Sequence, residues 1–514
     1  MTLLNVVLAL PVVGFFLLLF VPRDKPQVIR GLAIAMALIT LVASIGLAIG
    51  FGGGGSGMQF ATDVIWIPSP EIHFHVGIDG LSLWLVILTT LLTPICILVS
   101  WRSIDKRVKE FFAFLLLLEF GLIGVFISQD LFLFYVFWEV SLVPMYFLIG
   151  IWGHERRIYA AVKFFLFTMA GSMLMLTGII YIYNRAGTFD YPAILKMLAG
   201  SKISFTSGQE MLLFLAFFIA FAIKVPLFPL HTWLPDAHVE APTAGSVMLA
   251  SVMLKMGTYG LLRFCVPLFP EAARRCAPWI TVLAIIGIIY GALVAMVQPN
   301  MKKLVAYSSV SHLGFVVLGI FSFTQLGLDG AVYQMLNHGI STGALFVLVG
   351  YLYERRHSLV IADFGGVATP APWLSTIFLI TTLASIGLPT LNNFVGEYLV
   401  LQGAAEANFR WAAFAAIGVI LSACYMLWLY QRVFYGDTPE AVTGHVYDLG
   451  RREWAAIVPL VAMMVWMGVY TPSFLPPITR ANAAILDQSR MNVRFRVSLP
   501  PAPYLSAREV SRAR

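Results

Sequence analysis

The stretch MLLFLAFFIAFAIKVPLFPLHTW, residues 211–233, decides the fold class of this chain. Its apolar run is long enough to cross a bilayer, which takes about 20 residues of helix. Lys224 stands roughly 20 Å from its start, at 1.5 Å per residue, and Pro226 and Pro229 follow directly. A lysine at this depth costs roughly 2.5–3.5 kcal/mol on insertion scales. The stretch therefore predicts a broken membrane helix that holds a functional charge.

The overall composition also indicates a membrane protein. Hydrophobic residues make up 59% of the 514 residues and charged residues only 11%, with a mean hydropathy of +0.85. About a quarter of the residues of a soluble domain are charged. Only helices and closed barrels satisfy their backbone groups in lipid, and these apolar runs are far longer than barrel strands. We therefore expect an all-α polytopic membrane protein with about 14 transmembrane helices, at residues 2–21, 28–50, 81–101, 110–128, 131–152, 159–184, 211–233, 241–263, 277–298, 302–323, 327–352, 372–402, 410–435 and 454–472.

Loop charges predict how the chain is oriented. The loops after spans 1, 3, 5, 9, 11 and 13 carry lysines and arginines, and all of them fall on one face. By the positive-inside rule this face is cytoplasmic or matrix, and both termini lie outside. The net charge of +7 follows largely from these loops. The segment 478–514 disagrees because it holds seven arginines, but an end segment counts for less than the loops before it.

Composition predicts the local structure of three stretches outside the spans. Residues 51–80 contain a glycine-rich run at 52–57, which predicts a flexible loop because no Lys-Ser/Thr follows to bind phosphate. Residues 184–210 are read as an ordinary polar connection. The tail from Pro476 is rich in proline and arginine, so we expect an extended arm on a partner or on lipid headgroups.

Several chemistries are not indicated. The four cysteines form no CxxC pair, so neither a zinc site nor an iron–sulfur cluster is expected. No basic domain stands apart from the membrane to bind nucleic acid. The turn after Lys224 holds His231, Asp236, His238 and Glu240, but their spacing matches no metal motif. The first span, 2–21, lacks a basic n-region and a cleavage site and is read as retained.

Titratable residues recur in the middle of the predicted spans. Long side chains near a span end reach the interface, as Lys163 beside Arg156 can, but deeper charges mark ion or proton pathways. Histidine titrates nearest neutral pH and fits the same role. Glu119 remains open between a structural ion-pair partner and a transport residue. The candidate site residues are Glu119, Glu139, Lys224, Lys255, His312, His338 and Glu397.

Two broken spans divide the chain into halves. The seventh span breaks after Lys224, and the twelfth breaks around Pro389, Asn392, Asn393 and Gly396 before Glu397. Broken helices at corresponding positions of two halves point to a transporter's ion site, and five-helix repeats must be inverted. The predicted units are 1–109 (helices 1–3), 110–263 and 277–436 (the two repeats), and 454–514 (helix 14 and a basic tail).

These features predict a proton path across the plane of the membrane. Because a nearby glutamate alters the proton affinity of a buried lysine, a series of such groups can pass a proton along. The predicted order is Glu139, Lys224, Lys255, His338 and Glu397, with His312 beside them.

The chain also resembles a known family. KVPLFPLHTWLPDAHVEAPTAGSVMLASVMLKMGTYGLLR (Lys224–Arg263) is similar to the signature of antiporter-like subunits of respiratory complex I and their Mrp antiporter relatives. Further matches are HFHVGIDGLS (His73–Ser82), DLFLFYVFWEVSLVPMYFLIGIWG (Asp130–Gly153) and QPNMKKLVAYSSVSHLGF (Gln298–Phe315). The Phe-Val-Gly-Glu pattern ending at Glu397 resembles the chain M branch, the mitochondrial subunit-4 type. Thr390–Asn393 departs from the glycine- and serine-rich pattern of many bacterial members.

The resemblance implies a proton-pumping membrane subunit of NADH:quinone oxidoreductase, with fourteen helices and with Glu139, Lys224, Lys255 and Glu397 in proton transfer. It implies no cofactor in this chain, with NAD, FMN, iron–sulfur clusters and quinone in partner subunits. The implied partners are other complex I membrane subunits, including neighbouring antiporter-like chains, in a bacterial cell membrane rather than the mitochondrial inner membrane. The alternatives are an Mrp-type cation/proton antiporter subunit, a membrane subunit of an energy-converting hydrogenase, and a passive scaffold.

Overall fold

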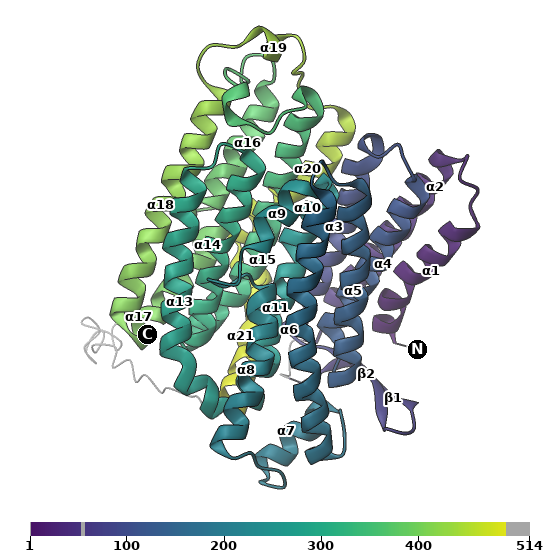
Figure 1. The fold of residues 1–514 in the computed structure, drawn as a ribbon, viewed down its shortest axis with the longest axis vertical. Coiled ribbons are helices and arrows are strands. Elements are labelled where there is room, and N and C mark those ends of the chain that lie inside the picture. Colours follow the sequence, from purple (N-terminus) through teal and green to yellow (C-terminus); the bar gives the residue numbers. More distant parts are fainter. Residues whose placement is uncertain (1, 53–56, 490–514) are drawn as a thin grey trace, which may run out of the picture.

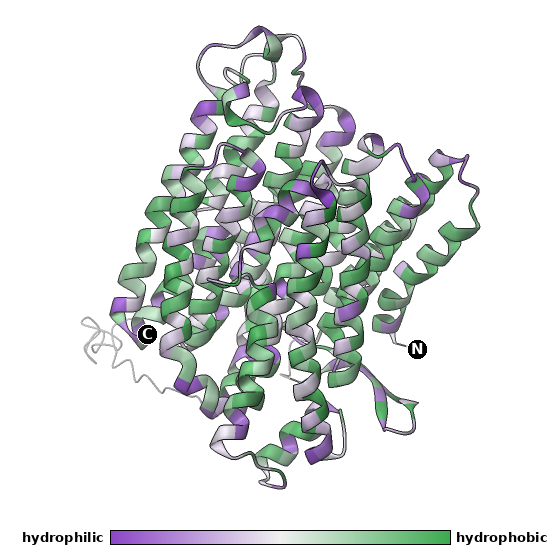
Figure 2. Ribbon diagram, viewed as in Figure 1, coloured by the Kyte–Doolittle hydropathy of each residue, from purple (hydrophilic) through white to green (hydrophobic). Residues whose placement is uncertain are grey.

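The computed structural model describes residues 2–52 and 57–489 and shows a bundle of long helices with short connections (Figure 1). Apolar residues dominate these helices, and hydrophilic residues gather at many of the loops (Figure 2). Thirteen helices of this described part are long and apolar enough to cross a membrane. They are α1 (Leu3–Phe20), α2 (Pro26–Gly50), α3 (Ser82–Ser103), α4 (Val108–Ile127), α5 (Leu131–Trp152), α6 (Arg157–Ala186), α8 (Ser207–Lys224), a composite helix (Thr243–Leu268), α13 (Pro270–Met296), α14 (Met301–Phe321), α15 (Gln325–Arg356), α18 (Phe409–Phe434) and α20 (Arg451–Val469).

The two predicted helix breaks are confirmed. α8 ends at Lys224 and the chain resumes as α9 (Trp233–Glu240), so the seventh span is shorter than the predicted range 211–233. The second break separates α16 (Pro372–Ser385) from α17 (Asn392–Ala407). This pair accounts for the remaining predicted span, and the prediction of about fourteen crossings is confirmed.

The composite helix changes its winding twice. It consists of α10 (Thr243–Met248), η1 (Leu249–Met253), α11 (Leu254–Gly260), η2 (Leu261–Cys265) and α12 (Val266–Leu268), and both η segments are π-helical. Single π-helical turns inside α-helices are rare and occur frequently at functional sites.

Two backbone pairings relate the halves of the bundle. Asp130, just before α5, pairs antiparallel with Asp190, after α6, and Asn300, just before α14, pairs in the same way with Val360, after α15. Both Asp130 and Asn300 cap the helix that follows by accepting backbone N–H groups. Five crossings separate Asp130 from Asn300, so the two pairings stand at opposite ends of the bundle. This is the relation that inverted repeats require.

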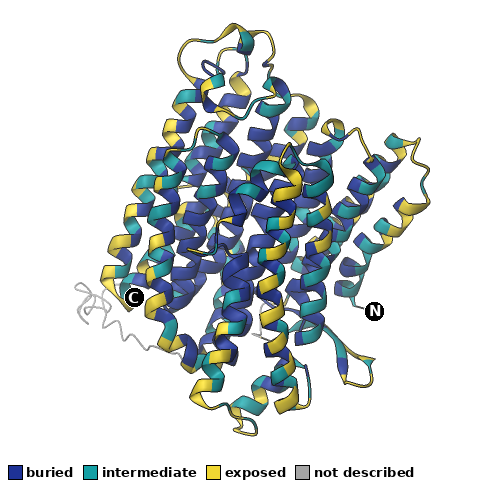
Figure 3. Ribbon diagram, viewed as in Figure 1, coloured by how far each residue is buried: buried dark blue, intermediate teal, exposed yellow. Residues whose placement is uncertain are grey.

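The centre of the bundle is formed by α14 and α15. In their most apolar stretches, every residue of α15 and almost every residue of α14 is buried, whereas only a third of the residues of α1 and α2 are. Figure 3 shows the same contrast between the central helices and the rim. Titratable side chains on α14 and α15 are therefore shielded from lipid.

Short elements fill two of the loops. After the glycine-rich run, whose residues 53–56 lie outside the described part, β1 (Gln59–Ile67) and β2 (Ile72–Ile78) pair as an antiparallel hairpin. α7 (Tyr191–Ala199) lies within residues 184–210, so the prediction of an ordinary polar connection was incomplete. The hairpin and α7 are at the end of the bundle opposite α19 (Glu440–Thr443) (Figure 1).

The prediction of an extended arm from Pro476 was wrong for the described residues. After η4 (Thr471–Ser473), these residues belong to α21 (Leu475–Gln488), because prolines are compatible with the first turn of a helix. One face of α21 is buried, and Thr479 and Asn482 each donate a hydrogen bond of 2.8 Å to Asp329 near the start of α15. The seven-arginine prediction falls mostly on residues 490–514, which lie outside the described residues.

Candidate functional site

Four titratable side chains from four helices form a line in the centre of the bundle, here called the buried line. Lys255 of α11 places its Nζ 2.6 Å from His338 Nδ1 of α15. The ring of His338 lies 5.9 Å, centroid to centroid, from that of His312 on α14. His312 Nδ1 then lies 2.9 Å from Glu397 Oε1 on α17. None of the four residues is more than 4% exposed.

The two histidines of the buried line each keep one free nitrogen. The Nε2 atoms of His312 and His338 are buried and have no hydrogen-bond partner among the described residues. Buried polar atoms are normally paired with protein or with ordered water. Water is therefore the natural bridge between the two rings. His312 was predicted beside the path, but it lies within it.

The π-helical winding of η1 helps to place Lys255. Besides His338, Lys255 Nζ donates a hydrogen bond of 2.6 Å to the carbonyl oxygen of Ala250, which belongs to η1. The ammonium group thus bonds backbone and side chain at once. This pairing satisfies a lysine that has no contact with solvent.

The second helix break brings Glu397 close to the backbone. Gly387 has φ +75°, and a Cβ on it would lie 3.1 Å from Glu397 Oε2. Glu397 Oε1 also accepts a hydrogen bond of 3.2 Å from Gln334. Asn392 and Asn393 donate to the Asn337 carbonyl and to Ser341 on α15. The side-chain amides of Asn392 and Asn393 thus attach the break to α15.

Lys224 and Glu139 form a looser arrangement in the first half. Lys224 Nζ is buried without a hydrogen bond and lies 5.4 Å from the ring of Trp138 and 5.2 Å from that of Phe164. The charge of Glu139 acts on Lys224, but no direct ion pair within 4 Å joins them among the described residues. The structure brings these two residues near each other and does not connect them directly to the buried line.

At the first helix break, the indole group of Trp233 forms a hydrogen bond with the backbone. Trp233, at the start of α9, donates a hydrogen bond of 2.9 Å from Nε1 to the carbonyl oxygen of Ile223, next to Lys224. The break thus follows Lys224 directly without leaving the Ile223 carbonyl group unpaired.

Glu119 stands apart from these groups. It is completely buried on α4, and neither carboxylate oxygen has a hydrogen-bond partner within 3.5 Å among the described residues. Thr93 of α3 is the polar side chain that faces it. The ion pair considered for Glu119 is not found within residues 2–52 and 57–489.

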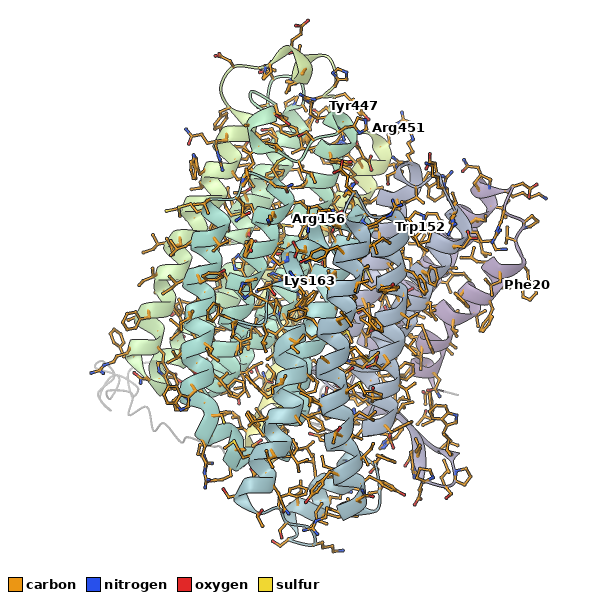
Figure 4. All side chains as sticks on the ribbon, viewed as in Figure 1. Phe20, Trp152, Arg156, Lys163, Tyr447 and Arg451 are labelled. Carbon is orange, nitrogen blue, oxygen red and sulfur yellow. The ribbon has the colours of Figure 1, made fainter. Side chains whose placement is uncertain are left out.

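Lys163 lies six residues after the start of α6 and is paired. Its Nζ lies 2.6 Å from Asp236 Oδ2 on α9. Figure 4 shows Lys163 and Arg156 close together, in the part of the molecule below Tyr447 and Arg451. Lys163 therefore forms an ion pair with the segment that follows the first break.

Sequence reasoning missed two buried ion pairs. Arg263 of η2 lies 2.6 Å from Asp79, just before α3. Burial raises the pKa of Asp79, but the Arg263 charge and several hydrogen bonds together hold that pKa below its usual range. Arg355 of α15 binds both carboxylate oxygens of Glu453, at 2.9 and 2.8 Å. Arg263 and Arg355 lie at span ends, where an arginine is easily taken for a loop charge.

No group of three or more His, Cys, Asp or Glu residues within 2–52 and 57–489 is placed to hold a metal ion. His238, the most deeply buried of the four residues considered after Lys224, stacks on Phe346 with ring centroids 4.6 Å apart. The four residues of the buried line thus pair with one another and with backbone, and Lys224 and His238 lie against aromatic rings.

A polytopic helical bundle with two broken helices in inverted halves and a buried line of lysine, histidines and glutamate defines an antiporter-like membrane transporter. Comparison with known proteins agrees. Residues 128–423 match the family model described as NADH:quinone oxidoreductase/Mrp antiporter, TM.

Curated relatives match over almost the whole chain. NADH-quinone oxidoreductase subunit M of Rhodobacter capsulatus is 45% identical over 500 residues, covering 95% of this chain and 96% of the relative. NADH-ubiquinone oxidoreductase chain 4 of Marchantia polymorpha is 44% identical, covering 92% and 94% of the two chains.

Solved structures share the fold. A chain of respiratory complex I from Thermus thermophilus with bound NADH has a TM-score of 0.85 and 34% identity, with 94% and 99% of the two chains covered. A chain of the Mrp complex from Dietzia sp. has a TM-score of 0.82 at 21% identity, over 96% and 99%, a likeness of fold alone.

The chain belongs to the NADH:quinone oxidoreductase/Mrp antiporter transmembrane family, as a member of its subunit M or chain 4 branch. It is a multi-pass membrane subunit of NADH:quinone oxidoreductase, part of respiratory complex I, of the proton-translocating antiporter-like kind. The resemblance to chain M is confirmed, and the alternatives of an Mrp antiporter subunit, a hydrogenase subunit and a passive scaffold give way to it.

Proposed function

We propose that protons cross the membrane within this subunit through the titratable residues of its two repeats. The observation that carries the proposal is the buried line from Lys255 through His338 and His312 to Glu397. Hydrogen-bond distances of 2.6 Å and 2.9 Å join its two ends, and the ring centroids of the two histidines are 5.9 Å apart. A chain of lipid-shielded groups that can each gain or lose a proton is expensive to bury. Stability of the fold alone would not favour four such residues next to one another in the buried line.

Electrostatic coupling supports a role for Glu139 and Lys224 in proton transfer, at a step before the proton reaches the buried line. The Glu139 charge acts on Lys224, and a change in a nearby charge alters the proton affinity of a buried lysine. Movement or protonation of Glu139 therefore releases or recaptures a proton at Lys224. Lys255 passes the proton laterally to His338, and Glu397 delivers it to the far side. Glu119 takes part in proton transfer as an additional buried carboxyl group.

The test is made in the assembled complex, reconstituted in lipid vesicles. Lys224→Ala and Glu139→Ala are each expected to lower the number of protons moved per NADH oxidised. Lys202→Ala, in the loop before α8, serves as the matched control. Undiminished proton movement in both site variants would refute the proposal.

We also propose the setting in which the subunit works. The names of the curated relatives support NAD chemistry and quinone reduction in the same complex, and we assign NAD, FMN, iron–sulfur clusters and quinone to partner subunits. We infer that other complex I membrane subunits, including antiporter-like chains, adjoin this one in a bacterial cell membrane. We divide the chain at 1–109, 110–263, 277–436 and 454–514.

A further inference from the structure

A cavity of about 410 Å³ opens between α2 and α20, with α3 and α15 beneath it; we call it the apolar slot. Every described side chain that lines it is apolar, apart from the indole N–H groups of Trp84 and Trp466. Ile49 and Trp466 at its rim are 83% and 51% exposed, whereas Leu336 of α15 is only 3% exposed. The slot therefore leads from the surface that faces lipid to the buried centre of the bundle.

The apolar slot extends from one membrane interface to the middle of the bilayer. α2 ends at Gly50 and α3 begins at Ser82, on either side of the β1–β2 hairpin, so both of these helix ends lie at the hairpin face of the bundle. Leu41 and Leu91, which line the slot, each lie nine residues from these ends, roughly 14 Å at 1.5 Å per residue. One leaflet contributes about half of a hydrocarbon core that is about 30 Å thick. The depth of the slot therefore matches the hydrocarbon of one leaflet.

Aromatic side chains lie at the interface end of the apolar slot. The ring of Phe474 lies 4.8 Å from that of Trp84 and 5.2 Å from that of Trp466, centroid to centroid. Trp84 belongs to the first turn of α3 and Trp466 to the last turn of α20. Tryptophan is enriched where membrane helices meet the lipid headgroups. This end of the slot therefore lies at the level of the ester groups of phospholipids.

The indole group of Trp84 leaves a hydrogen-bond donor free at this end. Trp466 Nε1 donates a hydrogen bond of 3.1 Å to Ser473 Oγ, but Trp84 Nε1 is buried and has no partner among the described residues. A buried indole N–H group normally has a partner. Water does not supply one readily, because a cavity with apolar walls stays dry. The missing acceptor therefore belongs to a ligand that is otherwise apolar.

The size of the apolar slot selects a thin occupant. An α-helix with its side chains is about 10 Å across, and a single turn of it would take up roughly the whole 410 Å³. A membrane helix of a partner subunit therefore cannot fill the slot along its depth. An acyl chain is thin and flexible, and the bilayer supplies it at high concentration. The ester carbonyl oxygen at the head of the chain is the acceptor that Trp84 lacks.

We propose that the apolar slot binds one acyl chain of a phospholipid from the leaflet at the hairpin face, with the ester carbonyl oxygen accepting a hydrogen bond from Trp84 Nε1. The chain lies along α3 and reaches Leu91. Leu88, which it covers, packs directly against Gly339, the neighbour of His338. The bound lipid thus stabilises the contact between α3 and α15 beside the buried line. This inference goes beyond the proposed function, because no titratable side chain among the described residues lines the slot.

Photoactivatable phospholipids test the position of the chain in the assembled complex, reconstituted in vesicles. One phosphatidylcholine carries a diazirine near the methyl end of an acyl chain, and a second carries it beside the ester group. After irradiation, peptide mass spectrometry is expected to find the first label near Leu91 and the second near Phe474. Ala48→Trp, which fills the slot from α2, should abolish both labels. Ala35→Trp, at an exposed position of α2 outside the slot, is the matched control and should keep both.

Three results would contradict the bound acyl chain. Equal labelling in the Ala48→Trp and wild-type complexes, both assembled on native gels, would overturn it. Loss of both labels on addition of a long-chain quinone would assign the slot to a quinone tail instead. Absence of both labels, together with a cross-link from Ile45→Cys to another subunit, would assign the slot to a partner protein.

Trp84→Phe tests the hydrogen bond without filling the slot. Phenylalanine keeps an aromatic ring beside Phe474 but has no N–H group. Radiolabelled phosphatidylcholine, chased with the unlabelled lipid, should leave the Trp84→Phe complex about fivefold faster than the wild type, as expected for the loss of one hydrogen bond. Trp279→Phe, at an exposed position of α13, is the control and should leave the rate unchanged. Equal rates in the two variants would overturn the contact between Trp84 and the lipid.

Discussion

His312 lies between His338 and Glu397, with its Nδ1 2.9 Å from the carboxylate and its ring centroid 5.9 Å from the neighbouring ring. Because its other nitrogen is buried without a partner among the described residues, one ring can receive a proton on one side and release it on the other. This position makes His312 the connection between the composite helix and the second broken helix.

Removal of the His312 ring is therefore expected to interrupt the buried line. His312→Ala should lower the protons moved per NADH oxidised, measured in vesicles containing the assembled complex. His445→Ala is the matched control, because His445 is exposed near α19 and bonds only the Ala441 carbonyl among the described residues. Equal ratios in the two variants would contradict the position assigned to His312.

Gly387→Ala is expected to disturb the second break. Its φ of +75° suits glycine, and the added Cβ would lie 3.1 Å from Glu397 Oε2. An alanine at positive φ destabilises by more than about 1 kcal/mol. We expect a lower midpoint of thermal unfolding together with reduced proton movement. Gly31→Ala, where a Cβ meets no atom within 4 Å, should change neither, and an unchanged Gly387→Ala complex would refute the strain argument.

The Arg355–Glu453 pair should be important for stability. Both side chains are almost fully buried, and removal of one partner leaves an unpaired buried charge at a cost of about 3–5 kcal/mol. Arg355→Leu should lower the unfolding temperature of the detergent-solubilised complex strongly. The double variant with Glu453→Leu should recover much of the loss, since no charge then remains unpaired. Equal loss in single and double variants would show that the pair itself is not responsible.

Docking of the hairpin should depend on pH. His75 of β2 lies 2.5 Å from Asp190, the N-cap of α7. The hydrogen bond to Asp190 raises the pKa of His75 above 6.5. Although burial raises the pKa of Asp190, its bonds with His75 and Ala193 hold it below 3.8. The His75 contribution is thus complete below pH 6.5 and lost as pH rises through its raised pKa, and the Asp190 contribution is lost as pH falls through its lowered pKa.

Hydrogen exchange of β2 and α7 measures this dependence. After correction for the intrinsic effect of pH on exchange, the protection of the β2 and α7 amides should decrease as pH rises above about 7. In this range a histidine loses its charge. His75→Gln should remove the decrease, while His357→Gln, at the opposite end of the bundle, should leave it intact. A decrease that persists in His75→Gln would assign the effect to another group.

The sequence predicted most of the spans and placed Lys255 and His338 inside helices well, because apolar length and helical rise are local properties. It could not predict that the two side chains touch, since residues 83 positions apart meet only through packing of the composite helix on α15. The π-helical turns have no distinct sequence signal. α21 was missed because Pro476 and Pro477 were read as ending regular structure, although both fit a first helical turn.

The attachment of α21 to Asp329 has a mechanical consequence. Asp329 is held by Gln325, Thr479 and Asn482 near the outer start of α15, the same helix that carries His338. Any rotation or sliding of α15 during turnover must therefore displace α21 as well. A probe on the exposed side of this surface helix would follow the displacement of a histidine that no probe can reach directly.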